Sequence, residues 1–167
     1  DDDRRLNYAA DRFGFAFALV EQMVVELRKS PQQQAHWTAF LDTIANQTAI
    51  AEACNAERME HLVEYERPTI RWMGWRPCDG HGFLVEDPLV MRQKLQEFGF
   101  QVPAEVRRVS VSNDEQSVTQ YCEAVEYFQT LPNCEGAVVY TVLKDGRTVS
   151  MYKEKNFHYI RRRAVRE

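Results

Sequence analysis

Residues 135–147 read Glu-Gly-Ala-Val-Val-Tyr-Thr-Val-Leu-Lys-Asp-Gly-Arg, and the run that follows, 148–155, ends in Lys-Glu-Lys. Asp-Gly between two runs of apolar and β-branched residues is a strong signal for the tight turn of a β-hairpin. The stretch therefore predicts two antiparallel strands near the end of the chain.

Three charged residues in this hairpin are hard to explain by packing alone. Glu135 stands at the start of an apolar strand, where burial of a carboxylate gains nothing. Lys153 and Lys155 are two apart on the returning strand, so both ammonium groups are expected on one face. Cations bind phosphates and a carboxylate ligates the accompanying metal, so a metal-bound polyphosphate would fit this set. The alternative is a solvated hairpin, because lysines often protect edge strands from aggregation.

Charge is distributed unevenly along the chain. The formal net charge of the 167 residues is −4, yet residues 138–167 carry eight Lys or Arg against three acidic residues. An acidic body with one basic end argues against a protein that coats nucleic acid generally. It favours one that holds phosphates at a defined site.

Length and composition indicate a single soluble domain, 1–167, with 28% charged residues. No run approaches the ~18 apolar residues of a membrane span, and no signal peptide opens the chain, so we expect no membrane partner. The cysteines show no metal-binding spacing, which predicts buried free thiols in a reducing intracellular compartment and no zinc site. They are Cys54, Cys78, Cys122 and Cys134.

The periodicity of apolar residues predicts a mixed α+β fold. Residues 1–12 are expected to be irregular. Helices are predicted over 20–27 and 33–45, from Asp87 to a stop at Gly99, and from Asn113 or Asp114 to Pro132, the last with Val118, Tyr121, Cys122, Val125 and Phe128 buried. Strands are predicted over 48–54, 69–76 and 106–111, in addition to the hairpin.

Glu52 is a second anomaly, because it stands in mid-strand among apolar neighbours. An unpaired buried carboxylate is costly, so Glu52 is expected either to have a basic partner or to face a cleft. The common dinucleotide, P-loop, zinc-protease and serine-hydrolase motifs are absent from the sequence.

These features occur in the order seen in the ligase domain of fungal-type tRNA ligases, RNA ligases of the covalent nucleotidyltransferase superfamily. Residues 49–54, followed by 60–65, resemble the third nucleotidyltransferase motif and the segment after it. Residues 69–74 look like the next motif, and 135–139 resemble motif IV, written EGxVV. Residues 153–155, with Tyr159, Arg163, Arg166 and Glu167, are similar to motif V and the arginine-rich segment after it. The resemblance covers roughly residues 37–167.

The resemblance implies an α+β nucleotidyltransferase fold of the ATP-grasp-like ligase type, with antiparallel sheets flanked by helices and incomplete at its amino end. It implies an ATP- and Mg²⁺-dependent RNA ligase of the tRNA repair and splicing type, acting on RNA ends such as tRNA halves. In such enzymes a lysine takes AMP from ATP, AMP passes to an RNA 5′-phosphate, and the RNA 3′-hydroxyl displaces it.

The same resemblance implies roles for individual residues. Glu52 would hold the ribose hydroxyls, Trp72 would stack on adenine with Trp75 as the rival, and Glu135 would help to bind the metal. Lys153 and Lys155 would neutralise the phosphates as charge develops on them. RNA phosphates would be contacted by Arg163 and Arg166.

The nucleophilic lysine of this family stands in Lys-x-Asp-Gly or Lys-x-Asn-Gly, and neither tetrapeptide occurs here. Residues 144–146, Lys-Asp-Gly, lack the intervening residue. Either an upstream segment or a partner chain supplies the lysine, or the domain is a catalytically silent ligase-like subunit that binds RNA or serves a structural role in a larger assembly. An unrelated α+β domain with chance matches is the remaining alternative.

Overall fold

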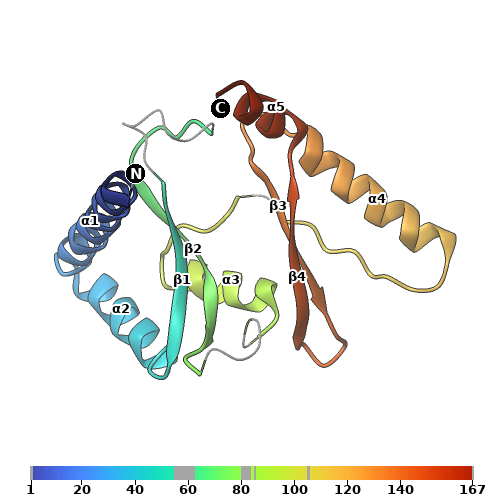
Figure 1. The fold of residues 1–167 in the computed structure, drawn as a ribbon. Helices are drawn as coiled ribbons and strands as arrows, with labels where there is room; N and C mark the ends of the chain where they lie inside the picture. Colours follow the sequence, from blue (N-terminus) through green and yellow to red (C-terminus); the bar gives the residue numbers. More distant parts are fainter. Residues whose placement is uncertain (1, 55–62, 80–83, 85, 105, 167) are drawn as a thin grey trace.

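The computed structural model describes residues 2–54, 63–79, 84, 86–104 and 106–166. Figure 1 shows two antiparallel strand pairs side by side, with helices on the outer side of each pair and one helix, residues 88–97, between the pairs. This arrangement confirms a mixed α+β fold with antiparallel sheets flanked by helices. Among the described residues, no helix is both long and apolar enough to cross a bilayer.

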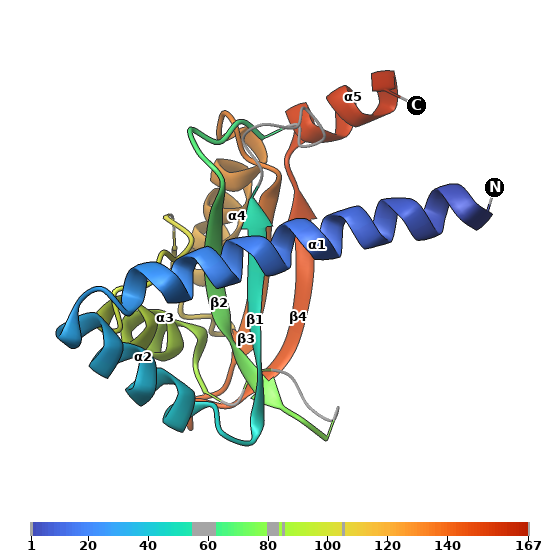
Figure 2. The ribbon, with the colours of Figure 1, turned by 90° about the vertical axis from the view of Figure 1, so that its left-hand side faces the viewer.

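The described residues of the first half of the chain form one sheet and three helices. They are α1 (Asp2–Leu27), α2 (Pro31–Thr43), β1 (Gln47–Cys54), β2 (Thr69–Pro77) and α3 (Pro88–Glu97). β1 and β2 pair antiparallel along their whole length, with a bulge after Ile50. The long helix α1 crosses in front of the strands and extends beyond them (Figure 2).

The second half builds the other sheet and two helices. They are α4 (Glu115–Thr130), β3 (Gly136–Val142), β4 (Thr148–Lys155) and α5 (Phe157–Arg166). β3 and β4 form the predicted hairpin, in which Leu143 N donates to Arg147 O at 2.9 Å. The helix α4 lies along this sheet and α5 follows directly from β4 (Figure 1).

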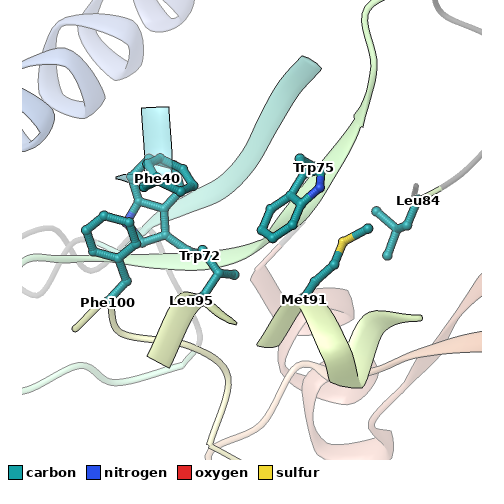
Figure 3. Packing of buried hydrophobic residues seen from close by; sticks show 7 residues of the cluster. All are labelled: Phe40, Trp72, Trp75, Leu84, Met91, Leu95 and Phe100. Atoms are coloured by element: carbon teal, nitrogen blue, oxygen red, sulfur yellow. The ribbon is translucent and has the colours of Figure 1, made fainter. Parts of the chain in front are cut away.

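An aromatic cluster between α2, β2 and α3 forms the core, as Figure 3 shows. Its buried members are Phe40, Trp72, Trp75, Leu84, Met91, Leu95 and Phe100. Tyr140 of β3 packs against the cluster, so this core also reaches the second sheet. A side chain at Gly74 would place its Cβ 2.8 Å from Met91 Sδ, which explains a glycine in the middle of β2.

The helix-capping signals in the sequence are confirmed. Asp87 accepts a hydrogen bond from Leu89 N at 2.8 Å with Pro88 at the first helical position, and Gly99 ends the segment with φ +80°. For α4 the cap is Asp114, which accepts from Ser117 N at 2.7 Å. Each cap satisfies an amide at a helix start that has no partner within the helix.

Two secondary-structure predictions are wrong. Residues 2–12 belong to α1 rather than to an irregular segment, because Leu, Ala and Arg, which recur in this stretch, have high helix propensity. Residues 106–111 form no strand. A strand needs a neighbour with which to exchange backbone hydrogen bonds, and this segment instead runs exposed, with Val111 70% exposed.

Burial predictions also need correction at α4 and at the cysteines. Val118 is 54% exposed and Cys122 is exposed, so the buried side of α4 is rotated away from them. The free thiol of Cys54 is buried and that of Cys134 is partly buried, whereas Cys78 is exposed. Only part of the predicted set of buried thiols is therefore buried.

Candidate functional site

Glu135 and Lys153 form an ion pair across the second hairpin. Glu135 immediately precedes β3, and Lys153 lies on β4 opposite Val138. Their side chains are 29% and 47% exposed. A pair this accessible to solvent contributes at most about 1 kcal/mol to folding. Both groups therefore remain accessible to a charged ligand.

Lys155 lies two residues further along β4, opposite Gly136, and so shares a face of the sheet with Lys153. Its Nζ is 5.7 Å from the centre of the Tyr159 ring on α5, a cation–π contact. Beside it is a shallow hollow on the surface. The hollow is lined by Lys155, Tyr159, Ile160, Arg163 and Ala164. Cationic groups thus continue from the hairpin onto α5.

The glycine after Glu135 has a steric cause. Gly136 has φ +140°, and a Cβ there would lie 2.8 Å from Lys155 Cα and closer still to the Glu154 carbonyl oxygen. Only glycine lets the start of β3 approach the β4 backbone so closely. The Glu-Gly pair therefore places the Glu135 carboxylate beside the strand that carries both lysines.

An apolar surface adjoins the lysines, and sequence reasoning missed it. Val138 is directly opposite Lys153. Met151 is two residues before Lys153 on β4, so it lies on the same face of the sheet. Val138 is 43% exposed and Met151 is 52% exposed. The alternation of Met151 with the two lysines was the available signal. Together these residues give the face a charged end and an apolar end.

Glu52 lies on the other sheet, in a second polar cluster. Arg71 is directly opposite it in the β1–β2 register, which is a basic neighbour, one of the two alternatives that the sequence left open for Glu52. The Arg71 guanidinium lies 5.1 Å from the centre of the Tyr65 ring. Burial, a hydrogen bond with the Cys54 thiol and the charge of Glu52 all raise the pKa of the Tyr65 hydroxyl. Burial likewise raises the pKa of the Cys54 thiol, which disfavours its reactive thiolate form.

The structure brings Glu135, Lys153 and Lys155 together and places Glu52 in a separate cluster. The carboxyl-terminal end of β1 and the amino-terminal end of β3 lie at the same end of the molecule in both views (Figures 1 and 2). At this end the backbone of Glu64 is hydrogen-bonded to the side chain of Asn133. Residues 60–62, part of the segment predicted to follow the third motif, lie outside the described residues.

The two tryptophans serve as core residues. Trp72 is 7% exposed, and its ring stacks on Phe100 at 5.3 Å and meets Phe40 edge-on at 5.2 Å. Trp75 is 1% exposed. Stacking of Trp72 on adenine stays a prediction that its surroundings do not favour, because its ring already packs against two core aromatics.

Of the two predicted RNA-binding arginines, Arg163 is exposed on α5 and lines the hollow beside Lys155. Arg166 is the last residue of α5, and its side chain lies outside the described part of the chain. Within the described residues, no cluster of three or more His, Cys, Asp or Glu could hold a metal ion. A single carboxylate such as Glu135 still suits Mg²⁺, which typically binds one or two carboxylates together with substrate phosphates.

A family model described as a domain of unknown function (DUF7920) matches residues 16–166. The chain belongs to the DUF7920 family. The matched span runs from within α1 to the end of α5, so both sheets and both polar clusters lie inside the DUF7920 domain. No curated protein and no solved structure matches the chain.

Proposed function

We propose that this chain is the nucleotide-binding part of an ATP- and Mg²⁺-dependent RNA ligase of the tRNA repair and splicing type. The observation that carries the proposal is the Glu135–Lys153 pair across the hairpin, with Lys155 on the same face. The order of motifs along the sequence supports it. So does the position of the Glu135 carboxylate next to Gly136, where the close approach of β3 to β4 requires a glycine.

Each group has a chemical task in this proposal. The ammonium groups of Lys153 and Lys155 offset the negative charge of a triphosphate and of the pyrophosphate that leaves. Mg²⁺, when bound, would supply positive charge that stabilises the charge developing on the phosphates. The Glu135 carboxylate is the protein ligand placed to hold that ion. Val138 and Met151 offer an apolar surface for a base beyond the phosphates.

In this geometry Lys153 and Mg²⁺ would compete for the Glu135 carboxylate. The Glu135 carboxylate pairs with Lys153 in the absence of nucleotide. On binding of ATP with Mg²⁺, Lys153 would turn to a phosphate and the carboxylate would turn to the metal. Both groups exchange one ionic partner for another, so little desolvation is added on binding.

The covalent step requires a lysine that these residues do not contain in the expected tetrapeptide. In that step the lysine nitrogen attacks the α-phosphorus, a P–N bond forms, and the bond to the β-phosphate breaks to release pyrophosphate. The absence of the tetrapeptide favours one alternative, a catalytically silent ligase-like subunit that binds RNA through the basic face of α5.

Binding of labelled ATP in the presence of Mg²⁺, measured by equilibrium dialysis, tests the proposal. Lys153→Ala or Lys155→Ala should weaken binding about tenfold or more, because a hydrogen bond to a charged group contributes about 1.5–3 kcal/mol. Lys144→Ala, in the exposed turn at the opposite end of the same sheet, is the matched control and should leave binding unchanged.

Covalent labelling separates the two candidates. The complete gene product, incubated with ATP labelled at the α-phosphate, should retain AMP if it is a ligase. RNA binding without ATP binding would support the silent subunit. Absence of both activities would overturn both proposals.

A further inference from the structure

Asn156 is a fully buried polar residue between the lysine strand and the basic helix. Its exposed fraction is 0%, and it stands between Lys155, the last residue of β4, and Phe157, the first of α5. Asparagine is mostly found at protein surfaces. A buried side-chain amide requires partners for two donors and for its oxygen.

Every polar group of Asn156 has a partner. Its Nδ2 donates to Phe128 O at 3.0 Å and to Leu131 O at 2.8 Å, carbonyls at the end of α4. Its Oδ1 accepts from His158 N at 2.8 Å and more weakly from Tyr159 N at 3.4 Å, two amides in the first turn of α5. One side chain therefore caps the end of one helix and the start of another.

The backbone of Asn156 adds the connection to the candidate site. Its N–H donates to Glu135 O at 2.9 Å, which continues the β3–β4 ladder by one step beyond the Gly136–Lys155 pair. The residue thus fixes the main chain of Glu135 directly opposite the end of the lysine strand. Through the first turn of α5 it also fixes Tyr159, whose ring contacts Lys155.

We propose that Asn156 is the positioning residue that sets the Glu135 carboxylate against Lys153 and Lys155. The inference rests on the proposed function for the use of that site, and on the hydrogen bonds alone for the geometry. Asn156 touches no substrate in this proposal. It acts through the backbone of Glu135 and through the junction of β4, α4 and α5.

Asn156→Asp separates positioning from helix capping. Aspartate caps helix starts as well as asparagine does, so α5 keeps its cap. An ionised carboxylate has no donor, so the bonds to Phe128 O and Leu131 O are lost and its charge faces two carbonyl oxygens. The junction should move away from α4 while both helices persist. Asn156→Ser, which keeps a capping oxygen without adding charge, replaces it if the aspartate variant does not fold.

Ser117→Ala is the matched control. Ser117 is also a buried polar residue, 4% exposed, and its hydroxyl donates to Ser112 O at 2.7 Å and accepts from Ser112 N at 3.1 Å. It lies in the first turn of α4, at the other end of the helix from the Asn156 contacts. The control therefore loses buried hydrogen bonds on the same helix without disturbing Glu135.

The first readout needs no ligand. The ¹³C resonance of the Glu135 carboxylate should shift when Lys153 is replaced by alanine, both in the parent protein and in Ser117→Ala. In Asn156→Asp the same replacement should leave the resonance unmoved, because the pair is already broken. A full response of Glu135 to Lys153→Ala in the Asn156 variant would overturn the inference.

The second readout is affinity for ATP with Mg²⁺ at a temperature where all variants are folded. Asn156→Asp should weaken binding about tenfold, and Ser117→Ala less than about twofold. If the parent protein does not bind ATP, the proposed function fails while the resonance experiment still decides the positioning role. Equal losses in the Asn156 and Ser117 variants would reduce Asn156 to a purely structural residue.

Discussion

The side-chain amide of Asn133 pairs with the backbone of Glu64, 69 residues earlier in the chain. Asn133 Oδ1 accepts from Glu64 N at 2.7 Å, and Asn133 Nδ2 donates to Glu64 O at 2.9 Å. The amide thus imitates one rung of a β-ladder. It joins the segment that leads into β2 to the turn that leads into Glu135, so it couples the two polar clusters at this end of the molecule.

Replacement of Asn133 should reveal the strength of this connection. Asn133 has φ +51°, a conformation that glycine adopts without strain, so Asn133→Gly removes only the two hydrogen bonds. We expect a loss of about 1–2 kcal/mol in the free energy of unfolding, measured by urea denaturation. Asn133→Ala should lose about 1 kcal/mol more, because alanine is strained at positive φ. Equal stability of Asn133→Gly and the parent protein would contradict a coupling role.

Gly136→Ala should be far more damaging than Gly146→Ala. Both glycines have positive φ, but only the Cβ at residue 136 would meet backbone atoms of the facing strand, whereas nothing lies within 4 Å at residue 146. We expect Gly146→Ala to cost about 1 kcal/mol from strain alone. Gly136→Ala should cost clearly more and also displace Glu135. Thermal unfolding and the affinity for ATP with Mg²⁺ would show the difference, and equal melting temperatures would contradict it.

Trp72→Phe should lower stability without abolishing nucleotide binding. The ring packs against Phe40 and Phe100 in the core, so loss of part of it leaves a cavity, and we expect a cost of about 1–3 kcal/mol in guanidinium unfolding. Affinity for ATP should stay within about threefold of the parent value, which corresponds to a change of less than about 1 kcal/mol in the binding free energy, because a core residue does not contact the nucleotide. A large loss of affinity in a stably folded Trp72→Phe would instead support adenine stacking.

Alkaline pH should act on Tyr152 through its partner. A hydrogen bond with the Tyr121 hydroxyl, followed by partial burial, raises the pKa of Tyr152 to about 12 from a usual value of 10.0. The folded state therefore favours neutral Tyr152, and this contribution to stability is present below pH about 10 and is lost as the pH rises towards 12. Tyr121→Phe should remove that contribution. Ultraviolet titration of tyrosinate, with Tyr152→Phe as the reference, should show one late-titrating tyrosine fewer in Tyr121→Phe than in the parent, because burial also raises the pKa of Tyr65 in both proteins.

Arg163→Ala tests the RNA-binding prediction on α5. Arg163 lines the hollow beside Lys155, where an RNA phosphate could lie. Removal of one phosphate contact should weaken binding of a 5′-phosphorylated RNA and reduce the slope of log affinity against log salt by about one. Lys29→Ala, in the exposed Glu26 pair after α1, is the charge-matched control and should leave the slope unchanged. An unaltered slope in Arg163→Ala would contradict the prediction.

Local signals in the sequence predicted most of the second hairpin. Asp145-Gly146 placed the turn, and the two-residue period placed Lys153 and Lys155 on one face, because both rules depend on neighbours in the chain. The sequence predicted only that Glu135 and Lys153 lie near each other, and it did not predict that they form an ion pair. The geometry of this pair depends on the close approach of Gly136 to the backbone of the facing strand β4. The only trace of this approach in the sequence is the glycine itself.

Long-range packing accounts for what the sequence did not predict. The resemblance to RNA ligases assigned Trp72 to adenine stacking. An aromatic residue in a strand can face either a core or a cleft, and here the positions of Phe40 and Phe100 place the Trp72 ring in the core. Asn156 gave no signal, since its partners at residues 128 and 131 are distant in sequence. The strand predicted over 106–111 failed for the same reason, because pairing is a property of two segments.

The placement of the tryptophans gives the two halves of the molecule different spectroscopic signals. All three tryptophans, Trp37, Trp72 and Trp75, belong to the α1–α3 half, whereas the α4–α5 half absorbs through tyrosines alone. Tryptophan emission therefore reports the melting of one half, and tyrosine absorbance is weighted towards the other. A single unengineered sample can then reveal whether the lysine-bearing hairpin and the aromatic core come apart in one transition or in two.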